Sequence, residues 1–316
     1  MSSVVVTGAN GFIGRALCRH LVASGHSVRG IVRSFEDPIA DVEYVLADLE
    51  SEVPLPPGTL AVDCIYHLAG RAHILNEPRR GALERFRKAN CEATVRLAKA
   101  ALIDGAQRFV FVSSIGVNGA SSGRLPFAES SPANPHTDYA VSKWEAEQAL
   151  HRLLDGREMA LVVVRPPMVY DTGAPGNFAR LLRLVSKGRV LPLGAIDNHR
   201  SIVSLRNLVH FLQLCGEHPS APGHILFPLD GEDVSTSEII AYLGEGMKKK
   251  TVLIPVPYWL ARWIAALLRR QSLYIQLYGS LQIEHGEARR LLGWSAAETS
   301  LEALRRVGRD YVGGLR

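Results

Sequence analysis

Short apolar runs and helical patterns alternate along the first half of the chain. The apolar runs at 4–6, 26–33, 42–49, 62–70, 108–114 and 160–167 are typical of buried β-strands. The segments at about 12–24, 80–104 and 138–155 have helical patterns, and a glycine follows each one: Gly25, Gly105 and Gly156. This alternation predicts an α/β fold in which helices cover both faces of a parallel sheet.

Three glycines, Gly8, Gly11 and Gly14, connect the first strand to the first helix. Gly8 permits a tight turn, Gly11 lets the backbone approach a ligand, and Gly14 lets the helix pack closely on the strand. The N-terminus of that helix directs free N–H groups and the positive end of its dipole at the turn, which suits a pyrophosphate. The pattern therefore predicts dinucleotide binding by a Rossmann-type, doubly wound sheet.

The regular alternation is lost after Met168. We expect residues 1–168 to form the dinucleotide-binding domain, with roughly 200–216 returning to it. Residues 169–199 and 217–316 mix short strands and helices, and we expect them to form a smaller α/β substrate-binding domain docked closely on the first.

Composition narrows the class of protein. Apolar residues make up 47% and charged residues 21% of the 316 residues, as in ordinary soluble globular proteins. The net charge of +5 is small and its basic residues are scattered, so no nucleic-acid partner is expected. The four cysteines lie in apolar stretches without CxxC spacing, which indicates buried thiols in a reducing compartment and no metal site. No basic leader precedes the first strand, so no signal peptide is expected and we predict a cytoplasmic protein.

The segment 257–277 is the most apolar in the chain. Arg262, Arg269 and Arg270 interrupt it well short of the roughly 20 apolar residues that cross a bilayer, so no integral membrane segment is expected. We expect an amphipathic helix packed on its own protein, with shallow membrane association as the alternative.

Candidate chemistry lies in the sequence YAVSK at 139–143. Tyr139 and Lys143 are four residues apart at the start of a predicted helix and so share one face. A nearby ammonium group would favour phenolate and lower the pKa of Tyr139, which is about 10 in isolation. Such a tyrosine exchanges a proton with a carbinol or carbonyl oxygen. Ser113 and Ser114 end a predicted strand at the same edge of the sheet, where a hydroxyl could bind that oxygen.

These motifs together resemble the extended short-chain dehydrogenases/reductases, also known as the NAD-dependent epimerase/dehydratase family, whose members act largely on nucleotide-linked sugars. The matching pieces are TGANGFIG (7–14), DL (48–49), HLAG (67–70), Asn90, VSSIGVNG (112–119), YAVSK (139–143), RPPMVY (165–170), RSIVSLRNLV (200–209) and LLGW (291–294). The resemblance spans essentially the whole chain.

The resemblance implies roles for individual residues. Ser114 would orient the substrate oxygen, Tyr139 would be the general acid/base, and Lys143 would also bind the nicotinamide ribose. Asn177 and Arg200 would hold the diphosphate of the substrate. The cofactor would contact Gly8, Asn10, Gly11, Phe12, Ile13, Gly14, Arg33, Asp48, Leu49, Leu68, Ala69, Gly70, Asn90, Tyr139, Lys143 and Pro166.

Two further features refine the resemblance. The dehydratases of the family carry an Asp-Glu pair where this chain has Ile115 and Gly116, which argues against sugar dehydration. The chain most resembles a bacterial subgroup of UDP-sugar 4-epimerases and UDP-4-keto-sugar reductases in O-antigen and other surface-polysaccharide synthesis. It departs from that subgroup at Asp171 and Thr172, where Gly-Pro is usual.

The end of the second strand bears on the cofactor. NAD enzymes usually place an acid there for the ribose 2′-OH, whereas this chain has Val32 followed by Arg33, which can pair with a 2′-phosphate. We therefore predict NADP over NAD; the alternative is that Glu36 or Asp37 reaches back to the ribose.

A preference for NADP favours a reductase, which exchanges its cofactor at each turnover. We predict a UDP-4-keto-6-deoxy-N-acetylhexosamine 4-reductase, with a UDP-hexose or UDP-N-acetylhexosamine 4-epimerase as the alternative. A dinucleotide-binding sensor without turnover is a third hypothesis, which the retained Tyr139 and Lys143 disfavour. By family analogy, the helices at 80–104 and 138–155 would form a homodimer contact.

Overall fold

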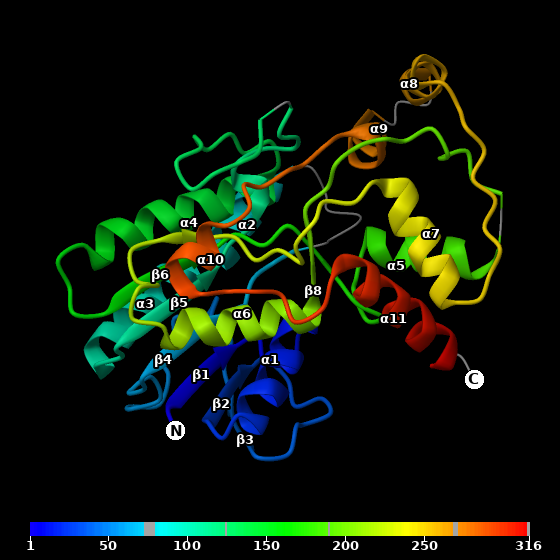
Figure 1. The fold of residues 1–316 in the computed structure, drawn as a ribbon. Helices are drawn as coiled ribbons and strands as arrows, with labels where there is room; N and C mark the ends of the chain where they lie inside the picture. Colours follow the sequence, from blue (N-terminus) through cyan, green and yellow to red (C-terminus); the bar gives the residue numbers. More distant parts are fainter. Residues whose placement is uncertain (73–79, 124, 189, 268–270, 315–316) are drawn as a thin grey trace.

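The computed structural model describes residues 1–72, 80–123, 125–188, 190–267 and 271–314. Its centre is a seven-stranded sheet in the order β3-β2-β1-β4-β5-β6-β9, and each neighbouring pair is parallel. The strands are β1 (Ser3–Thr7), β2 (Ser27–Val32), β3 (Val42–Leu46), β4 (Cys64–His67), β5 (Arg108–Val112), β6 (Ala160–Val164) and β9 (Ile225–Leu226). The predicted parallel sheet is confirmed (Figure 1).

Helices cover both faces of this sheet. On one face α1 (Phe12–Ala23) packs beside α6 (Leu205–Glu217), and their leucines join the sheet valines in one buried cluster. On the other face α3 (Ala93–Asp104) and α4 (Asp138–Leu154) form a second cluster with residues that include Phe109 and Phe111. The apolar positions recur every three or four residues, so each helix buries one face and leaves the other to solvent. The Rossmann-type, doubly wound class is thereby confirmed.

The strand order reverses between β1 and β4, which run side by side although β2 and β3 separate them in the chain. Thr7 pairs with His67 at the carboxyl ends of these two strands. In open parallel sheets, ligands bind in the crevice beyond such a reversal.

The helix predicted at 80–104 is interrupted. It consists of α2 (Ala82–Arg87), a π-helical turn η1 (Lys88–Glu92), and α3. A π turn adds a residue to the helical turn and often occurs at functional sites. Asn90 lies in this turn and is completely buried.

A smaller lobe lies beyond the carboxyl edge of the sheet, at the right in Figure 1. Its core is formed by α5 (Asn177–Ser186), α7 (Thr236–Gly246) and α11 (Ser300–Gly313), together with β7 (Met168–Tyr170) and β8 (Ile202–Ser204), which pair with each other. The helices α8 (Tyr258–Leu267) and α9 (Gln271–Tyr278) lie beyond this core. The helix α10 (Glu287–Leu292) packs instead on the central sheet, where Ala288 and Leu292 join the cluster of α1 and α6. Capping boxes at Ser235 and Thr299 fix the starts of α7 and α11.

The segment 200–216 divides between the two parts: β8 pairs with β7, whereas α6 packs on the central sheet. Ile225 and Leu226, within the range 217–316, extend the central sheet beside β6. The boundaries of the two domains stay a prediction.

The sequence also made predictions about burial. Cys18, Cys64 and Cys215 are buried, Cys91 is half-buried, and all four are free thiols, as expected. None of the helices in the described ranges is long and apolar enough to cross a bilayer. As expected, the segment 257–277 packs on its own protein, because α8 contacts α9 and the Tyr258 hydroxyl accepts the Asp197 amide, but Trp259 and Trp263 of α8 are 72% and 62% exposed. Arg269 and Arg270 lie outside the described residues.

Candidate active site

The turn after β1 has the geometry that its glycines predict. Gly8 has φ +68°, the left-handed region that favours glycine, and its carbonyl accepts a hydrogen bond from the Gly11 amide at 2.9 Å. A β-carbon on Gly14 would lie 2.1 Å from the Gly8 oxygen, so only glycine allows α1 to lie so close to the turn. No side chain caps α1 at Gly11. The first-turn N–H groups of α1, at Phe12, Ile13 and Gly14, are therefore available to a phosphate, with Asn10 in the turn before them.

A buried chain of hydrogen bonds ties the turn to the neighbouring strand and helix. The Thr94 hydroxyl donates to the Asn90 carbonyl at 2.7 Å, so its oxygen accepts from His67 Nε2 at 2.8 Å. His67 Nδ1 then accepts from the Thr7 hydroxyl at 2.7 Å, and the Thr7 oxygen accepts the amides of Leu68 and Ala69. Burial lowers the pKa of His67 to about 3, so the ring is neutral. This chain was not predicted from the sequence.

Asn90 fixes the segment that follows β4. Its side chain accepts from the Arg71 amide at 2.7 Å and donates to the Arg71 carbonyl and the Ser142 hydroxyl. A β-carbon on Gly70 would meet Asn90 Oδ1 at 2.9 Å and Lys143 Nζ at 3.5 Å. Gly70, Asn90 and Lys143, three residues predicted from separate motifs, therefore lie together.

Ser114 and Tyr139 also meet. Ser114 follows β5, caps the 3-10 turn η2 (Ile115–Val117), and accepts a hydrogen bond from the Gly116 amide at 3.1 Å. Burial raises the pKa of Tyr139 to about 12, and a hydrogen bond from Ser114 to the phenol acts in the opposite direction. Thr137 caps the start of α4, and the Phe86 ring packs edge-on against Tyr139 at 6.2 Å between centroids. The phenol and a hydroxyl are thus held side by side at the carboxyl edge of the sheet.

Lys143 does not lower the pKa of Tyr139, contrary to the expectation from their spacing. Its Nζ instead donates to the Val112 carbonyl at 2.9 Å and lies 4.6 Å from the centroid of the Phe111 ring. Burial lowers the pKa of Lys143 itself to about 8, and the negative charge of Glu147 opposes that effect. The burial of the phenol outweighs any influence of the cation.

A buried ion pair lies next to Lys143. Glu147, one helical turn further along α4, binds Arg165 with 2.5 Å between Oε2 and Nη2, and both side chains are almost fully buried. Glu147 also accepts a hydrogen bond from Ser113, and Arg165 donates to Asn118 at 3.0 Å. Next along the chain is the buried Pro166, whose carbonyl accepts the Ile115 amide at 3.0 Å. The only signal in the sequence for the ion pair of Glu147 with Arg165 was that Glu147 stands four residues after Lys143.

Arg33 follows directly after β2, whose Ile31 carbonyl binds the Gly8 amide at 3.1 Å. Its side chain is exposed and makes no ion pair within the described part of the chain. The Asp37 carboxylate, proposed above as an alternative ribose ligand, instead pairs with Arg15 of α1 at 2.6 Å.

The pair at 48–49 follows β3. Asp48 is exposed and accepts from the Glu50 amide at 3.0 Å. Leu49 is half-buried against the sheet, and its carbonyl accepts from Arg96 of α3 at 2.9 Å. These contacts fix the loop after β3.

The two predicted substrate residues converge on α9. Asn177 starts α5 and donates to the Gln276 side chain at 2.8 Å. Arg200 donates to the main-chain carbonyls of Gln276 and Gly279 at 2.9 and 3.0 Å, and burial lowers its pKa. No acidic residue pairs with Arg200 among the residues that the structure describes, so its charge remains available to an anion. The sequence did not predict Gln276 as the residue that joins them.

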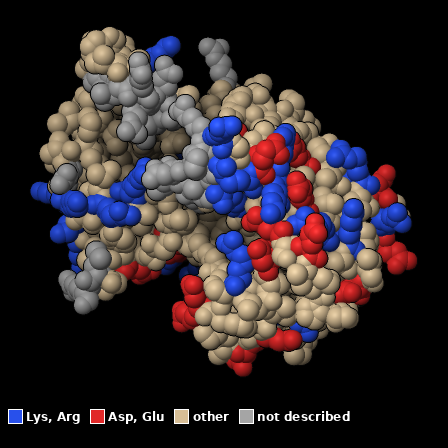
Figure 2. Space-filling model, turned by 180° about the vertical axis from the view of Figure 1, so that it is seen from behind, with Lys and Arg blue, Asp and Glu red and all other residues tan. Residues whose placement is uncertain are grey.

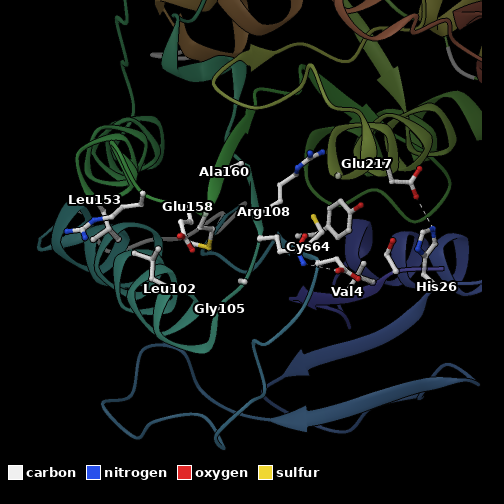
Figure 3. Close-up of a pocket in the computed structure, with 18 residues that line it drawn as sticks. Val4, His26, Cys64, Leu102, Gly105, Arg108, Leu153, Glu158, Ala160 and Glu217 are labelled. Atoms are coloured by element: carbon white, nitrogen blue, oxygen red, sulfur yellow. Dashed lines mark hydrogen bonds and ion pairs between the residues drawn. The ribbon is translucent and has the colours of Figure 1, made fainter.

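A hollow of about 880 Å³ lies at the opposite edge of the sheet (Figure 3). Val4, Cys64, Arg108 and Ala160, at the amino ends of four strands, line it. Since the glycine turn, Ser114 and Lys143 all lie at the carboxyl edge, this hollow is not the candidate active site. The described residues contain no cluster of His, Cys, Asp or Glu that could hold a metal ion.

The sheet reversal, the glycine turn and the Ser114–Tyr139–Lys143 group define an α/β protein of the dinucleotide-dependent oxidoreductase class. Residues 4–226 match the model of the NAD dependent epimerase/dehydratase family, and the chain belongs to that family. The chain is thereby an NAD-dependent enzyme of the nucleotide-sugar epimerase/dehydratase type.

Known proteins of similar sequence and structure agree with this assignment. A UDP-glucose 4-epimerase of Vibrio cholerae is 35% identical over 98% of this chain and 95% of its own. An N-acetyl-alpha-D-glucosaminyl-diphospho-ditrans,octacis-undecaprenol 4-epimerase of Escherichia coli O157:H7 is 22% identical over 81% of this chain and 76% of its own. The structure of a UDP-glucuronic acid 4-epimerase from Bacillus cereus with NAD has a TM-score of 0.76 at 19% identity, with 99% of each chain covered, and therefore shares the fold.

Proposed function

We propose that this protein is a 4-epimerase of a UDP-hexose or UDP-N-acetylhexosamine that moves a hydride from and back to C4 of the sugar. The observation that carries the proposal is the meeting of Ser114 and Tyr139 at the carboxyl edge of the sheet, beside Lys143 and Gly70. The sequence favoured reduction of a 4-keto sugar. The names of the two relatives, both 4-epimerases, support epimerisation instead.

The residues present fit a dinucleotide. The glycine turn leaves the N–H groups of a helix available, and position 70 beside Lys143 has no space for a side chain larger than that of glycine. Bound NAD would accept the hydride from C4 and return it. Gly8 to Gly14 would hold the pyrophosphate, and Lys143 with Asn90 would border the nicotinamide ribose.

The geometry of Ser114 and Tyr139 indicates how the proton of the sugar hydroxyl is transferred. As the C4–H bond breaks, the sugar O4–H bond also breaks, and the phenolate of Tyr139 takes that proton while C4 and O4 become a carbonyl. The Ser114 hydroxyl, which lies within hydrogen-bonding reach of the phenol, would donate to the same O4. When the hydride returns to the other face of C4, Tyr139 gives the proton back to O4. Substrate binding must lower the pKa of Tyr139 from about 12.

Arg200 and Asn177 would bind the diphosphate. Arg200 is half-buried, carries no acidic partner in the described residues, and presents the planar group that suits a phosphate. The two relatives differ in what the diphosphate carries, uridine in one name and undecaprenol in the other. The relative of higher identity supports a UDP-sugar.

A 4-ketoreductase that uses NADPH is the second candidate. The observation in its favour is the end of β2, where no carboxylate stands and Arg33 is exposed without a partner among the described residues. Asp37, one of the two alternative ribose ligands, forms an ion pair with Arg15. A reductase consumes one NADPH at each turnover, so a preference for NADP favours this candidate.

One experiment separates the two candidates. The enzyme is incubated with UDP-glucose and with UDP-N-acetylglucosamine under NMR, and in parallel with a UDP-4-keto sugar and NADPH at 340 nm. A 4-epimerase interconverts the first pair of substrates with their 4-epimers without net oxidation of NADPH. Consumption of NADPH equal to the keto sugar reduced, with no epimerisation, would establish the reductase.

The setting of the enzyme is also a proposal. We propose a cytoplasmic homodimer in which α2, α3 and α4 form the contact and which supplies a sugar for O-antigen or other surface-polysaccharide synthesis. The proposal of a dimer rests on family analogy, and Ile103 at the end of α3, which is 86% exposed, offers a position at which to test it. Sedimentation velocity of the parent and of Ile103→Glu tests the dimer.

A further inference from the structure

The helix α8 presents an apolar face that the rest of the chain does not cover. Trp259, Trp263 and Leu267 are four residues apart, so they form one stripe along the helix, and they are 72%, 62% and 67% exposed. Single exposed apolar residues are common, but two tryptophans and a leucine in one stripe are not. In the segment before the helix, Val252 and Ile254 are also exposed.

Basic residues accompany the apolar face. Between Glu245 and Glu284 the chain has no Asp or Glu but has six Lys and Arg, although the chain as a whole has nearly equal numbers of each sign. Lys248, Lys249 and Lys250 are exposed directly before Val252, and Arg262 is exposed on α8 itself.

The helix α5 adds to this charge. Arg180, Arg183 and Lys187 are exposed at spacings of three and four. A β-carbon on Gly188, just after this helix, would lie 3.7 Å from the Lys250 carbonyl, so the two basic groups adjoin. None of these basic side chains has an ion pair within the described part of the chain. Figure 2 agrees: red side chains lie mainly over the larger lobe, while the lobe at the left carries blue side chains and uncharged surface.

We propose that the surface formed by residues 248–267 and the exposed side of α5 docks on an anionic lipid bilayer. Tryptophan prefers the interface between headgroups and acyl chains, and basic residues beside an apolar helix face are attracted to anionic headgroups. A water-soluble acidic partner would match the charges but would not require the tryptophan stripe. A second copy of this basic surface would repel the first.

Docking there would bring the proposed diphosphate ligands close to the membrane. The Tyr258 hydroxyl accepts the Asp197 amide at 2.9 Å, three residues before Arg200, and Arg200 itself binds the end of α9. The surface therefore lies beside the proposed diphosphate ligands. The inference concerns where the enzyme acts and is independent of whether it epimerises or reduces its substrate.

Vesicle sedimentation with the full chain tests the proposal. We expect binding to vesicles of phosphatidylcholine with 30 mol% phosphatidylglycerol, weak binding to pure phosphatidylcholine, and loss of binding in 0.5 M NaCl. Trp259→Ser/Trp263→Ser should weaken binding at least about tenfold, as should reversal of the charges of Lys248, Lys249 and Lys250 to Glu. The matched control is Val53→Ser/Leu125→Ser, which removes two apolar side chains of similar exposure from other surfaces.

Each variant is first checked for an unchanged circular dichroism spectrum and Tm. Absence of parent binding to either vesicle, or equal binding by the parent and the double tryptophan variant, would overturn the proposal. If the parent does not bind vesicles and the double tryptophan variant loses its dimer, the proposal would also be overturned, because the surface would then be a contact between copies.

Discussion

The ammonium group of Lys143 donates to the main-chain carbonyl of Val112, with 2.9 Å between Nζ and O. Val112 ends β5, two residues before Ser114, so this bond fixes α4 to the strand that carries the candidate hydroxyl. It also directs the cation to the strand end, and the pKa of Tyr139 is accordingly raised by burial rather than lowered by charge. Activation of the phenol therefore depends on the groups that arrive with cofactor and substrate.

Tyr139→Phe removes the proposed acid/base and keeps the ring that packs on Phe86. We expect kcat to fall by about 10²–10⁴, the usual contribution of general acid–base catalysis, with the affinity for cofactor within about threefold of the parent. Kinetics and cofactor titration measure the two. Ser114→Ala, which keeps the phenol, should lower kcat less. Full turnover by Tyr139→Phe would remove the tyrosine from the mechanism.

Arg33→Ala tests the proposed contact with a 2′-phosphate. If Arg33 pairs with it, the affinity for NADP should fall roughly tenfold and the affinity for NAD should stay unchanged. Calorimetric titration of both cofactors measures this, with Arg29→Ala as the control, since Arg29 lies on the same strand but pairs with Glu43. Tighter binding of NAD than of NADP by the parent, unaffected by Arg33→Ala, contradicts the predicted preference.

Glu147→Gln tests the buried ion pair next to Lys143. The change leaves Arg165 charged and buried without a counter-charge, and we expect the free energy of unfolding to fall by about 3–5 kcal/mol. The control is Glu145→Gln, two residues away on the same helix, whose pair with Arg87 is partly exposed and should contribute less than about 1 kcal/mol. Urea unfolding measures both variants, and equal losses would show that burial does not strengthen the first pair.

The neutral state of His67 predicts a dependence of stability on pH. The pKa of this residue is about 3 in the folded chain and about 6.5 when it is unfolded, so below pH 6.5 the unfolded state binds a proton that the folded state does not. Its contribution to the free energy of unfolding therefore decreases as pH falls, by roughly 1.5 kcal/mol between pH 6.5 and 5. Urea unfolding of the parent and of His67→Asn measures it: the parent should lose about that much more than the variant. Parallel losses would mean that His67 is protonated in the folded chain.

The sequence predicted the central fold because its signals are local. Valine runs such as 4–6, and the glycines that end helices such as Gly105, specify strands and helix ends within a few residues. The π turn at Lys88–Glu92 was not predicted, because the extra residue leaves the apolar periodicity almost unchanged. The pairing of β9 with β6 was also missed, since two residues give no periodic signal.

The sequence predicted individual residues of the candidate site, but not the hydrogen bonds that connect them. Gly70, Asn90 and Lys143 were each predicted to contact the cofactor, and the fold brings them together. The Thr7–His67–Thr94 chain, and the role of Gln276 between Asn177 and Arg200, depend on side chains brought together by the fold from distant positions. The exposure of α8 could not be predicted from its pattern, because an amphipathic helix looks the same whether protein, membrane or solvent faces its apolar side.

The most direct test of the proposed reaction follows the hydrogen on C4. UDP-glucose and UDP-N-acetylglucosamine, each deuterated at C4, are incubated separately with the enzyme and NAD, and the sugars are analysed by NMR and mass spectrometry. The account predicts that at least one of them yields a 4-epimer that retains the deuterium at C4, because the same hydride leaves and returns within one active site. Absence of interconversion of both sugars, or a 4-epimer that has exchanged the deuterium for hydrogen from water, would contradict it.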